Sequence, residues 1–166
     1  MILDRLGEPE AVAQLRVCCG ARRWIEGMLA ARPFGSAARA RDEADRIWSG
    51  LGPADWLEAF DHHPRIGERK TVASQDTTAA ARSSNEQAQV TKAAAEVKKE
   101  LAQVNAEYER RFGFIYIVSA AGHTAEELLA IARERMHNDR DTELRVAAEE
   151  QRKIMQLRLA KLLEMT

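Results

Sequence analysis

Two adjacent histidines precede a proline in the segment DHHPRIGERK, which covers residues 61–70. Pro64 disfavours the helical conformation for the residue before it, so we expect His63 to lie extended at or beyond a helix end. An imidazole is the side chain best suited to transfer protons near neutral pH. A cationic ring also interacts well with the exposed carbonyl groups of a helix end. Taken alone, the motif favours a helix stop over a proton carrier.

A second candidate group is SSNEQ, residues 83–87, which lies where a long helical pattern begins. Ser83 with Glu86, and Ser84 with Gln87, have the spacing of a capping box. The same first helical turn carries exposed N–H donors, which suit an anionic or carbonyl-rich ligand. The local sequence favours the cap.

Arg158 is the third candidate, because the predicted last helix surrounds it with apolar residues one turn away, namely Ile154, Met155 and Leu162. Its guanidinium can reach water while the stem lies on the core, which is the usual arrangement. If it stays buried it needs an anion, and a carboxylate is its best bidentate partner. His63, the 83–87 turn and Arg158 together offer a proton carrier, a carboxylate and an anion clamp.

Metal and cofactor motifs are missing from the sequence. Glu134 and His137 have the helical offset used in di-iron bundles, but such sites need two copies of that motif. Neither zinc-type spacing nor a Gly-rich phosphate loop occurs. Cys18 and Cys19 are adjacent, so they predict inert, partly buried thiols and no disulfide framework. We therefore expect neither a metal nor a cofactor.

The composition limits the classes of partner. The chain has 166 residues, of which 45% are hydrophobic and 31% charged, and its formal net charge is −1. These values fit one folded domain over residues 1–166 and indicate neither a nucleic acid nor a membrane as partner. With no apolar stretch of spanning length and no signal-like start, we expect a cytoplasmic protein.

The first half of the chain predicts three helices, at residues 9–31, at 36–48 with Ser36 as its cap, and at 54–62. Residues 71–85 have little periodicity and predict a loop. The clearest pattern follows, where apolar residues recur at spacings of three and four from Val90 to Tyr108. Gly113 closes this long helix.

The segment FIYIVSAAG, residues 114–122, is rich in β-branched and aromatic residues and has the local character of a strand. No second strand is available to pair with it, so we expect a buried, extended or short helical connector. Thr124 and Glu127 form a capping box for a helix that ends near residues 137–139, and a final helix covers 141–164. The predicted fold is all-α, a single-domain helical bundle.

Several of these segments occur in a familiar order. HPRIG, SSNEQ, YERRFGFIYIVSAAG, RMHND and KIMQLRL together resemble the OHCU decarboxylases, from about residue 8 to the carboxyl end. That family converts 2-oxo-4-hydroxy-4-carboxy-5-ureidoimidazoline (OHCU) to (S)-allantoin in urate catabolism. The ordered combination is much more specific than any one of the motifs.

The resemblance implies a cofactor-free, all-helical, dimeric enzyme that acts on a small molecule. Its catalytic pair falls on His63 and Glu86. Its substrate-binding positions fall on Pro64, Ser83, Gln87, Phe114, Ile115, Tyr116, Ile117 and Arg158, with residues 114–117 contributing through their backbone. Arg65 stays outside this set.

The chemistry implied by the resemblance agrees with the missing cofactor motifs. The substrate carries a carboxylate and a hydroxyl on one carbon beside a ring imine, so it can accept its own electron pair when carbon dioxide leaves. Which of His63 and Glu86 acts as acid or base at each step stays open. Without the resemblance, the same residues would favour a non-catalytic helical interaction module, and a helical metalloprotein would rank third.

Overall fold

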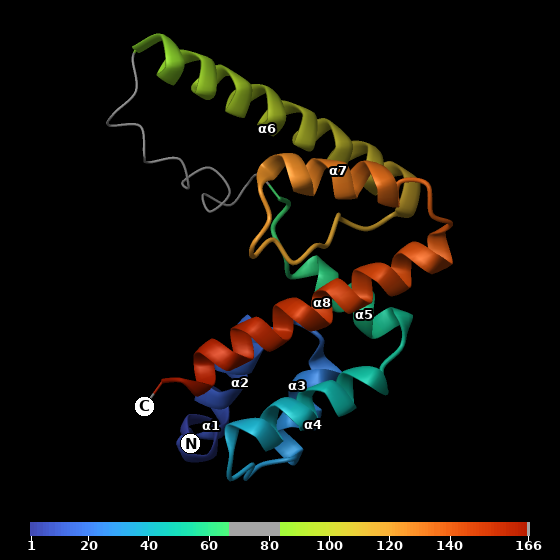
Figure 1. Cartoon of the computed structure of the whole chain (residues 1–166). Helices are drawn as coiled ribbons and strands as arrows, with labels where there is room; N and C mark the ends of the chain where they lie inside the picture. Colours follow the sequence, from blue (N-terminus) through green and yellow to red (C-terminus); the bar gives the residue numbers. More distant parts are fainter. Residues whose placement is uncertain (67–83, 166) are drawn as a thin grey trace. The chain divides into compact units, whose positions relative to one another are not determined.

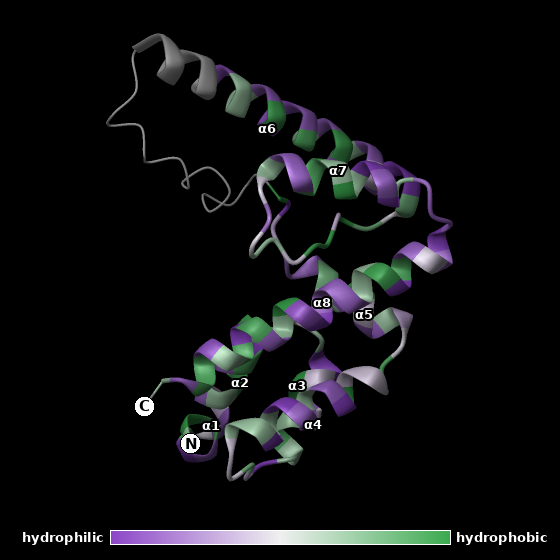
Figure 2. Cartoon of the chain, viewed as in Figure 1, coloured by the Kyte–Doolittle hydropathy of each residue, from purple (hydrophilic) through white to green (hydrophobic). Residues whose placement is uncertain are grey.

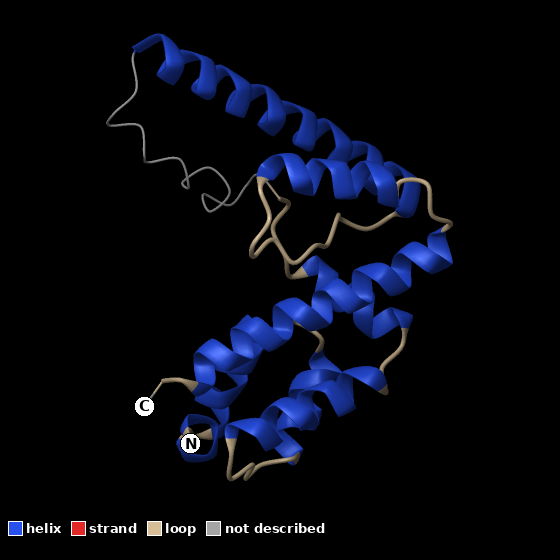
Figure 3. Ribbon diagram, viewed as in Figure 1, coloured by secondary structure: helices blue, strands red, loops and turns tan. Residues whose placement is uncertain are grey.

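The computed structural model describes the backbone of residues 1–66 and 84–165, and the side chains of residues 1–66 and 92–165. Every regular element in these ranges is a helix (Figure 3), which confirms the predicted all-α class. The helices are α1 (Ile2–Arg5), α2 (Glu8–Cys18), α3 (Arg22–Ala30), α4 (Ala37–Ser49), α5 (Pro53–Asp61), α6 (Ser84–Phe112), α7 (Ala125–Arg135) and α8 (Arg140–Leu163). The loop predicted at 71–85 lies outside the described residues, apart from its last two, which belong to α6.

The helices fall into two compact units (Figure 1). Unit 1 comprises Met1–His63, Ile117–Ser119 and Leu144–Thr166, and unit 2 comprises Pro64–Tyr116 and Ala120–Glu143. Unit 1 therefore holds α1 to α5 and most of α8, while unit 2 holds α6, α7 and the first turn of α8. Green and purple segments alternate along the described part of α6 in Figure 2, as expected for an amphipathic helix.

The prediction of one helix over residues 9–31 is wrong, because the chain leaves the helical conformation between α2 and α3. Cys19 (φ −156°, ψ 129°) and Ala21 (φ −72°, ψ 117°) are both extended. The first turn of α3 is stabilised from another helix, since the Arg22 backbone N–H donates to the Glu58 carboxylate of α5 at 2.5 Å. Apolar periodicity continues through this junction and does not reveal a cap that comes from elsewhere in the chain.

The predicted ends at Ser36, Thr124 and Gly113 are confirmed, whereas the capping box predicted within residues 83–87 lies outside the described side chains. Ser36 accepts a hydrogen bond from the backbone N–H of Arg39 at 3.2 Å, at the start of α4. Thr124 accepts one from the N–H of Glu127 at 3.1 Å, at the start of α7. Gly113 follows the end of α6 with a φ of 82°, which favours glycine.

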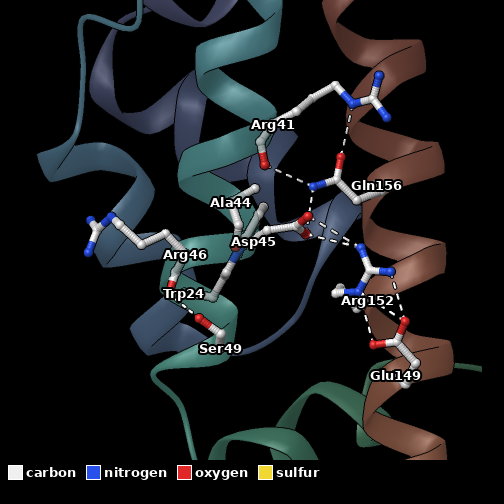
Figure 4. Close-up of polar contacts among 9 residues, drawn as sticks. All are labelled: Trp24, Arg41, Ala44, Asp45, Arg46, Ser49, Glu149, Arg152 and Gln156. Atoms are coloured by element: carbon white, nitrogen blue, oxygen red, sulfur yellow. Dashed lines mark hydrogen bonds and ion pairs between the residues drawn. The ribbon is translucent and has the colours of Figure 1, made fainter.

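In unit 1, α8 combines a buried apolar face with polar contacts to α4. Its apolar face contributes buried residues that include Ala147, Met155, Leu159 and Leu162. A polar network joins it to α4 (Figure 4). There the Gln156 amide donates to the Asp45 carboxylate at 2.8 Å and to the Arg41 carbonyl at 2.9 Å. Arg152 pairs with Asp45 at 3.3 Å, so α4 and α8 are fixed in register.

Unit 2 has an aromatic core. The Tyr108 ring lies 4.7 Å from Phe112, 5.8 Å from Phe114 and 5.4 Å from Tyr116, between ring centroids. Phe114 and Tyr116 belong to the predicted connector, which has no strand and is buried at these positions. The expectation of a buried connector in place of a strand is confirmed.

A buried ionic cluster lies beside this core. Glu143, which is fully buried, accepts hydrogen bonds from the Tyr108 hydroxyl at 2.5 Å and from Nε of Arg135 at 2.6 Å. The Asn138 amide donates to the other carboxylate oxygen at 3.0 Å. Burial acts to lower the pKa of Arg135, but its hydrogen bond to Glu143 and the neighbouring groups hold that pKa above the usual value. The guanidinium also lies 4.9 Å from the centre of the Tyr116 ring.

Candidate functional site

His63 lies just outside α5, where the sequence predicts it. The helix ends at its C-cap residue His62, and the His63 backbone N–H still donates to the Phe60 carbonyl at 3.0 Å. Nε2 of the His63 ring lies 2.6 Å from Oε1 of Gln151 in α8. His63 is half-buried whereas His62 is exposed, so the two neighbours occupy different environments.

Gly20 in the α2–α3 junction lies against the side chain of His62. A Cβ atom built on Gly20 would be 2.6 Å from Cβ of His62, a separation that real side chains do not adopt. Glycine therefore allows the junction to approach the end of α5 closely. The junction therefore lies directly against the residue that precedes His63.

Arg158 contacts the same junction from α8. Its guanidinium donates to the Val17 carbonyl at 3.0 Å, and the residue is half-buried. Arg158 follows Gln151 by seven residues, which places both on one face of α8 and separates them by roughly 10 Å along the axis. The partner of His63 and the predicted anion clamp therefore share a helix face within unit 1.

The two adjacent thiols, Cys18 and Cys19, are buried, which disfavours the reactive thiolate form. Burial raises the pKa of Cys18 to about 11 and that of Cys19 to about 12, although the Arg158 cation acts in the opposite direction on both. Both thiols are protonated at neutral pH, in agreement with the expectation of inert cysteines.

The remaining predicted site residues are distributed over the other parts of the chain. Ser83 lies outside the described residues, and Glu86 and Gln87 lie in the first turn of α6, where the backbone alone is described. Pro64 and residues 114–116 belong to unit 2, and Ile117 belongs to unit 1.

Three of the four side chains in the 114–117 segment point into protein, and Ile115 is half-buried. The Tyr116 hydroxyl donates to the Leu128 carbonyl at 2.9 Å, and Phe114, Tyr116 and Ile117 are each no more than 6% exposed. A ligand would therefore meet this segment through its backbone, as the resemblance implies.

The segment that follows His63 is anchored on α6. Arg65 forms a bidentate ion pair with Glu109, with distances of 2.5 and 3.0 Å. The Asn105 amide donates to the Ile66 carbonyl at 2.8 Å. Arg65 therefore holds the loop on the helix, which fits its exclusion from the predicted catalytic set.

Sequence reasoning missed Gln151. The apolar face of α8 contains Leu144, Ala147, Ala148, Met155, Leu159 and Leu162 at spacings of three and four. Gln151 falls within this pattern, between Ala148 and Met155, as a fully buried polar residue. A polar side chain at a core position was the available signal, but its partner His63 is 88 residues away in sequence.

Two further classes of site are absent from the described residues. Over residues 1–66 and 92–165, no group of three or more His, Cys, Asp or Glu side chains is arranged to hold a metal ion. None of the helices in the described part of the chain has the length and apolar character needed to cross a membrane.

Comparison with known proteins decides the family. The family model described as OHCU decarboxylase matches residues 4–160. The chain belongs to the OHCU decarboxylase family. A crystal structure of an OHCU decarboxylase in the presence of (S)-allantoin is 38% identical, with a TM-score of 0.73, and the match covers 90% of this chain and 96% of that one.

Curated relatives agree with the OHCU decarboxylase assignment. The uric acid degradation bifunctional protein TTL of Arabidopsis thaliana is 35% identical over 158 residues, which cover 89% of this chain and 45% of the relative. This chain therefore spans less than half of that bifunctional protein. The 2-oxo-4-hydroxy-4-carboxy-5-ureidoimidazoline decarboxylase of Haloferax volcanii is 27% identical over 138 residues, which cover 82% of this chain and 79% of the relative.

Proposed function

We propose that this chain decarboxylates OHCU to (S)-allantoin in urate catabolism, without a cofactor. The observation that carries the proposal is His63, which stands outside α5 with one ring nitrogen held by Gln151 on the helix face that also bears Arg158. Family membership over residues 4–160 supports it. A helical interaction module gives no role to a half-buried histidine held in this way.

The substrate supplies the electron sink for the reaction. The bond between the ring carbon and the carboxylate breaks, carbon dioxide leaves, and the electron pair moves toward the adjacent imine. The imine nitrogen takes up a proton from solvent as it receives this pair. The hydroxyl on the carbon that lost the carboxylate then gives up its proton and becomes a carbonyl, while the neighbouring ring carbon receives a proton. The protein must therefore orient the carboxylate, accept one proton and deliver one proton to a single face.

The residues divide these tasks. His63 and Glu86 carry out the proton transfers, to which a histidine near its ordinary pKa can contribute about 10²–10⁴-fold. Arg158 holds an anionic or carbonyl part of the substrate through its planar fork. The remaining contacts to the substrate come from Pro64, Ser83, Gln87 and the backbone of Phe114, Ile115, Tyr116 and Ile117.

The assembly and location are part of the same proposal. We expect a cytoplasmic homodimer of a single domain over residues 1–166. Its formal net charge of −1 gives no electrostatic reason for binding nucleic acid or an anionic membrane.

A coupled assay tests the activity. OHCU is generated enzymatically from urate, the protein is added, and the decay of the OHCU absorbance is followed together with the circular dichroism of the allantoin formed. Spontaneous decay gives racemic product, so the optical signal isolates the enzymatic reaction. Decay at the background rate, with racemic product, would contradict the proposal.

Matched variants of the two neighbouring histidines test the site. His63→Ala should lose at least about 100-fold in turnover, because proton transfer is removed. The control is His62→Ala, in which the exposed neighbour is truncated and turnover should stay within a few-fold of the unmodified protein. Equal losses in both variants would show that position 63 has no special role.

A further inference from the structure

We propose that Gln151 is a positioning residue that fixes the tautomer and orientation of the His63 ring, so that Nδ1 is the nitrogen that exchanges protons. The proton-transfer part of this inference rests on the proposed function. The tautomer itself is a property of the protein without substrate and can be measured independently of activity.

The geometry defines which nitrogen carries the proton. Oε1 of Gln151 faces Nε2 of His63 at 2.6 Å, and an amide oxygen only accepts hydrogen bonds. Nε2 must therefore be the N–H donor. In the neutral ring the lone pair then lies on Nδ1, which becomes the basic atom. Rotation of the ring is opposed because it would break this hydrogen bond.

The other end of the Gln151 amide has no partner. Its Nε2 atom is buried without a hydrogen-bond acceptor among the described residues, and the side chain is fully buried. Burying an unpaired amide nitrogen is unfavourable, and a leucine of similar size would avoid that cost. Among the described residues, the bond to His63 is thus the single polar contact made by the Gln151 side chain, which argues against a purely structural role.

Gln156, five residues further along α8, shows which contacts a structural glutamine makes in unit 1. Its side chain has three polar contacts, donating to the Arg41 carbonyl at 2.9 Å and to Asp45 at 2.8 Å, and accepting from Nε of Arg41 at 3.1 Å (Figure 4). Both ends of this amide are paired. Gln156 is therefore a matched control for Gln151, with the same residue type on the same helix.

This assignment changes which residue orients the His63 ring. A ring has two nitrogens, and Gln151 occupies one of them. The orienting role that a carboxylate plays in a catalytic triad is here filled by a neutral amide. Glu86 is then left to act on the substrate or to share Nδ1 in turn, and is not required to orient the ring.

The test compares Gln151→Leu, Gln151→Glu and the control Gln156→Leu. In Gln151→Leu we expect kcat to fall about 10- to 100-fold with a smaller change in KM, as when a partner that orients a functional histidine is lost. Its melting temperature should equal or exceed that of the unmodified protein. Gln151→Glu retains an acceptor oxygen and should restore part of the lost turnover. Gln156→Leu should melt at a lower temperature and keep its kcat.

Nuclear magnetic resonance of ¹⁵N-labelled protein without substrate provides the direct readout. The chain has four histidines, and the His63 signals are those that disappear in His63→Asn. We expect a downfield Nε2–H proton for His63 that exchanges slowly with water, is absent in Gln151→Leu and persists in Gln156→Leu. A proton on Nδ1 with the lone pair on Nε2 would overturn the inference.

The outcomes separate this inference from the proposed function. If the unmodified protein shows the Nε2–H signal but does not decarboxylate OHCU, the proposed function fails and the tautomer assignment stands. If the protein is active and Gln151→Leu turns over equally fast, the positioning role fails and the function stands. A loss of turnover in Gln151→Leu that merely follows a lower melting temperature would also overturn the positioning role.

Discussion

Replacing Glu143 by glutamine removes the negative charge at the centre of the buried cluster in unit 2. The carboxylate is fully buried and is contacted by the Tyr108 hydroxyl, by two nitrogens of Arg135 and by the Asn138 amide. Arg135 is 7% exposed, so in Glu143→Gln its cation would stay buried without this counter-charge. Breaking a buried pair from one side costs about 3–5 kcal/mol. For a chain of this size, each kcal/mol corresponds to about 2–4 °C, which gives a fall in Tm of roughly 6–20 °C.

The control is an exposed ion pair in the same unit. Arg133 and Glu100 lie 3.0 Å apart, with side chains that are 58% and 46% exposed. Water and salt screen such a pair, so Glu100→Gln should cost less than about 1 kcal/mol. Both variants remove one carboxylate charge, and they differ in the burial of the carboxylate that is replaced.

Thermal and urea unfolding followed by far-ultraviolet circular dichroism measure both variants. The double variant Arg135→Met with Glu143→Leu removes both charges and should recover much of the stability lost in Glu143→Gln, since no unpaired charge remains. If Glu143→Gln unfolds like Glu100→Gln, the cluster does not depend on its charge and the reasoning from burial is refuted.

Three further predictions concern unit 1. Gly20→Ala should lower turnover at least several-fold by displacing His62 from the junction, measured by the coupled assay; an unchanged rate would mean that this close approach does not position the site. Burial acts to raise the pKa of Asp4, but hydrogen bonds from the backbone N–H groups of residues 34–35, together with the positive charges of the amino terminus and Arg32, hold this pKa below its ordinary value of 3.8. The ionised Asp4 carboxylate therefore contributes its full share of the folding free energy above pH 3.8, and this contribution is lost as the pH falls through the lower pKa of the folded state. The urea midpoints of Asp4→Asn and the unmodified protein should differ at pH 7 and converge in strong acid. Arg158→Lys keeps the charge but loses the planar fork, so KM should rise by about tenfold or more, and unchanged kinetics would return Arg158 to a snorkelling role.

Local signals in the sequence were sufficient for most helix ends. Ser36, Thr124 and Gly113 act within three or four residues of their own position, through a side-chain cap or a left-handed conformation. The connector at 114–122, which is buried at 114 and 116–118, was predicted because a strand without a partner cannot satisfy its backbone. These features depend on short-range chemistry, which a sequence displays directly.

Features that depend on distant residues could not be predicted in the same way. The end of α2 and the start of α3 are set by Gly20 against His62 and by Glu58 on the Arg22 N–H, contacts that join positions 36 or more residues apart. Local helix propensity gives no sign of such tertiary caps.

The candidate site shows the same limit. The position of His63 beyond α5 followed from Pro64, but its hydrogen-bond partner is reached only when α8 packs into unit 1. The motif RMHND entered the prediction through the resemblance. In the structure its arginine and asparagine, Arg135 and Asn138, bind the buried Glu143.

The adjacent cysteines of the α2–α3 junction can serve as a built-in probe of local opening in the native protein. They are the two cysteines of the chain, both are buried, and their protonated thiols react slowly with alkylating agents and disulfides. Any fluctuation that separates the junction from α8 would expose them to solvent and restore their ordinary reactivity. The rate at which a thiol reagent labels the native protein therefore reports how often this region opens, with no added probe, and a bound substrate that holds Arg158 in place would slow that labelling.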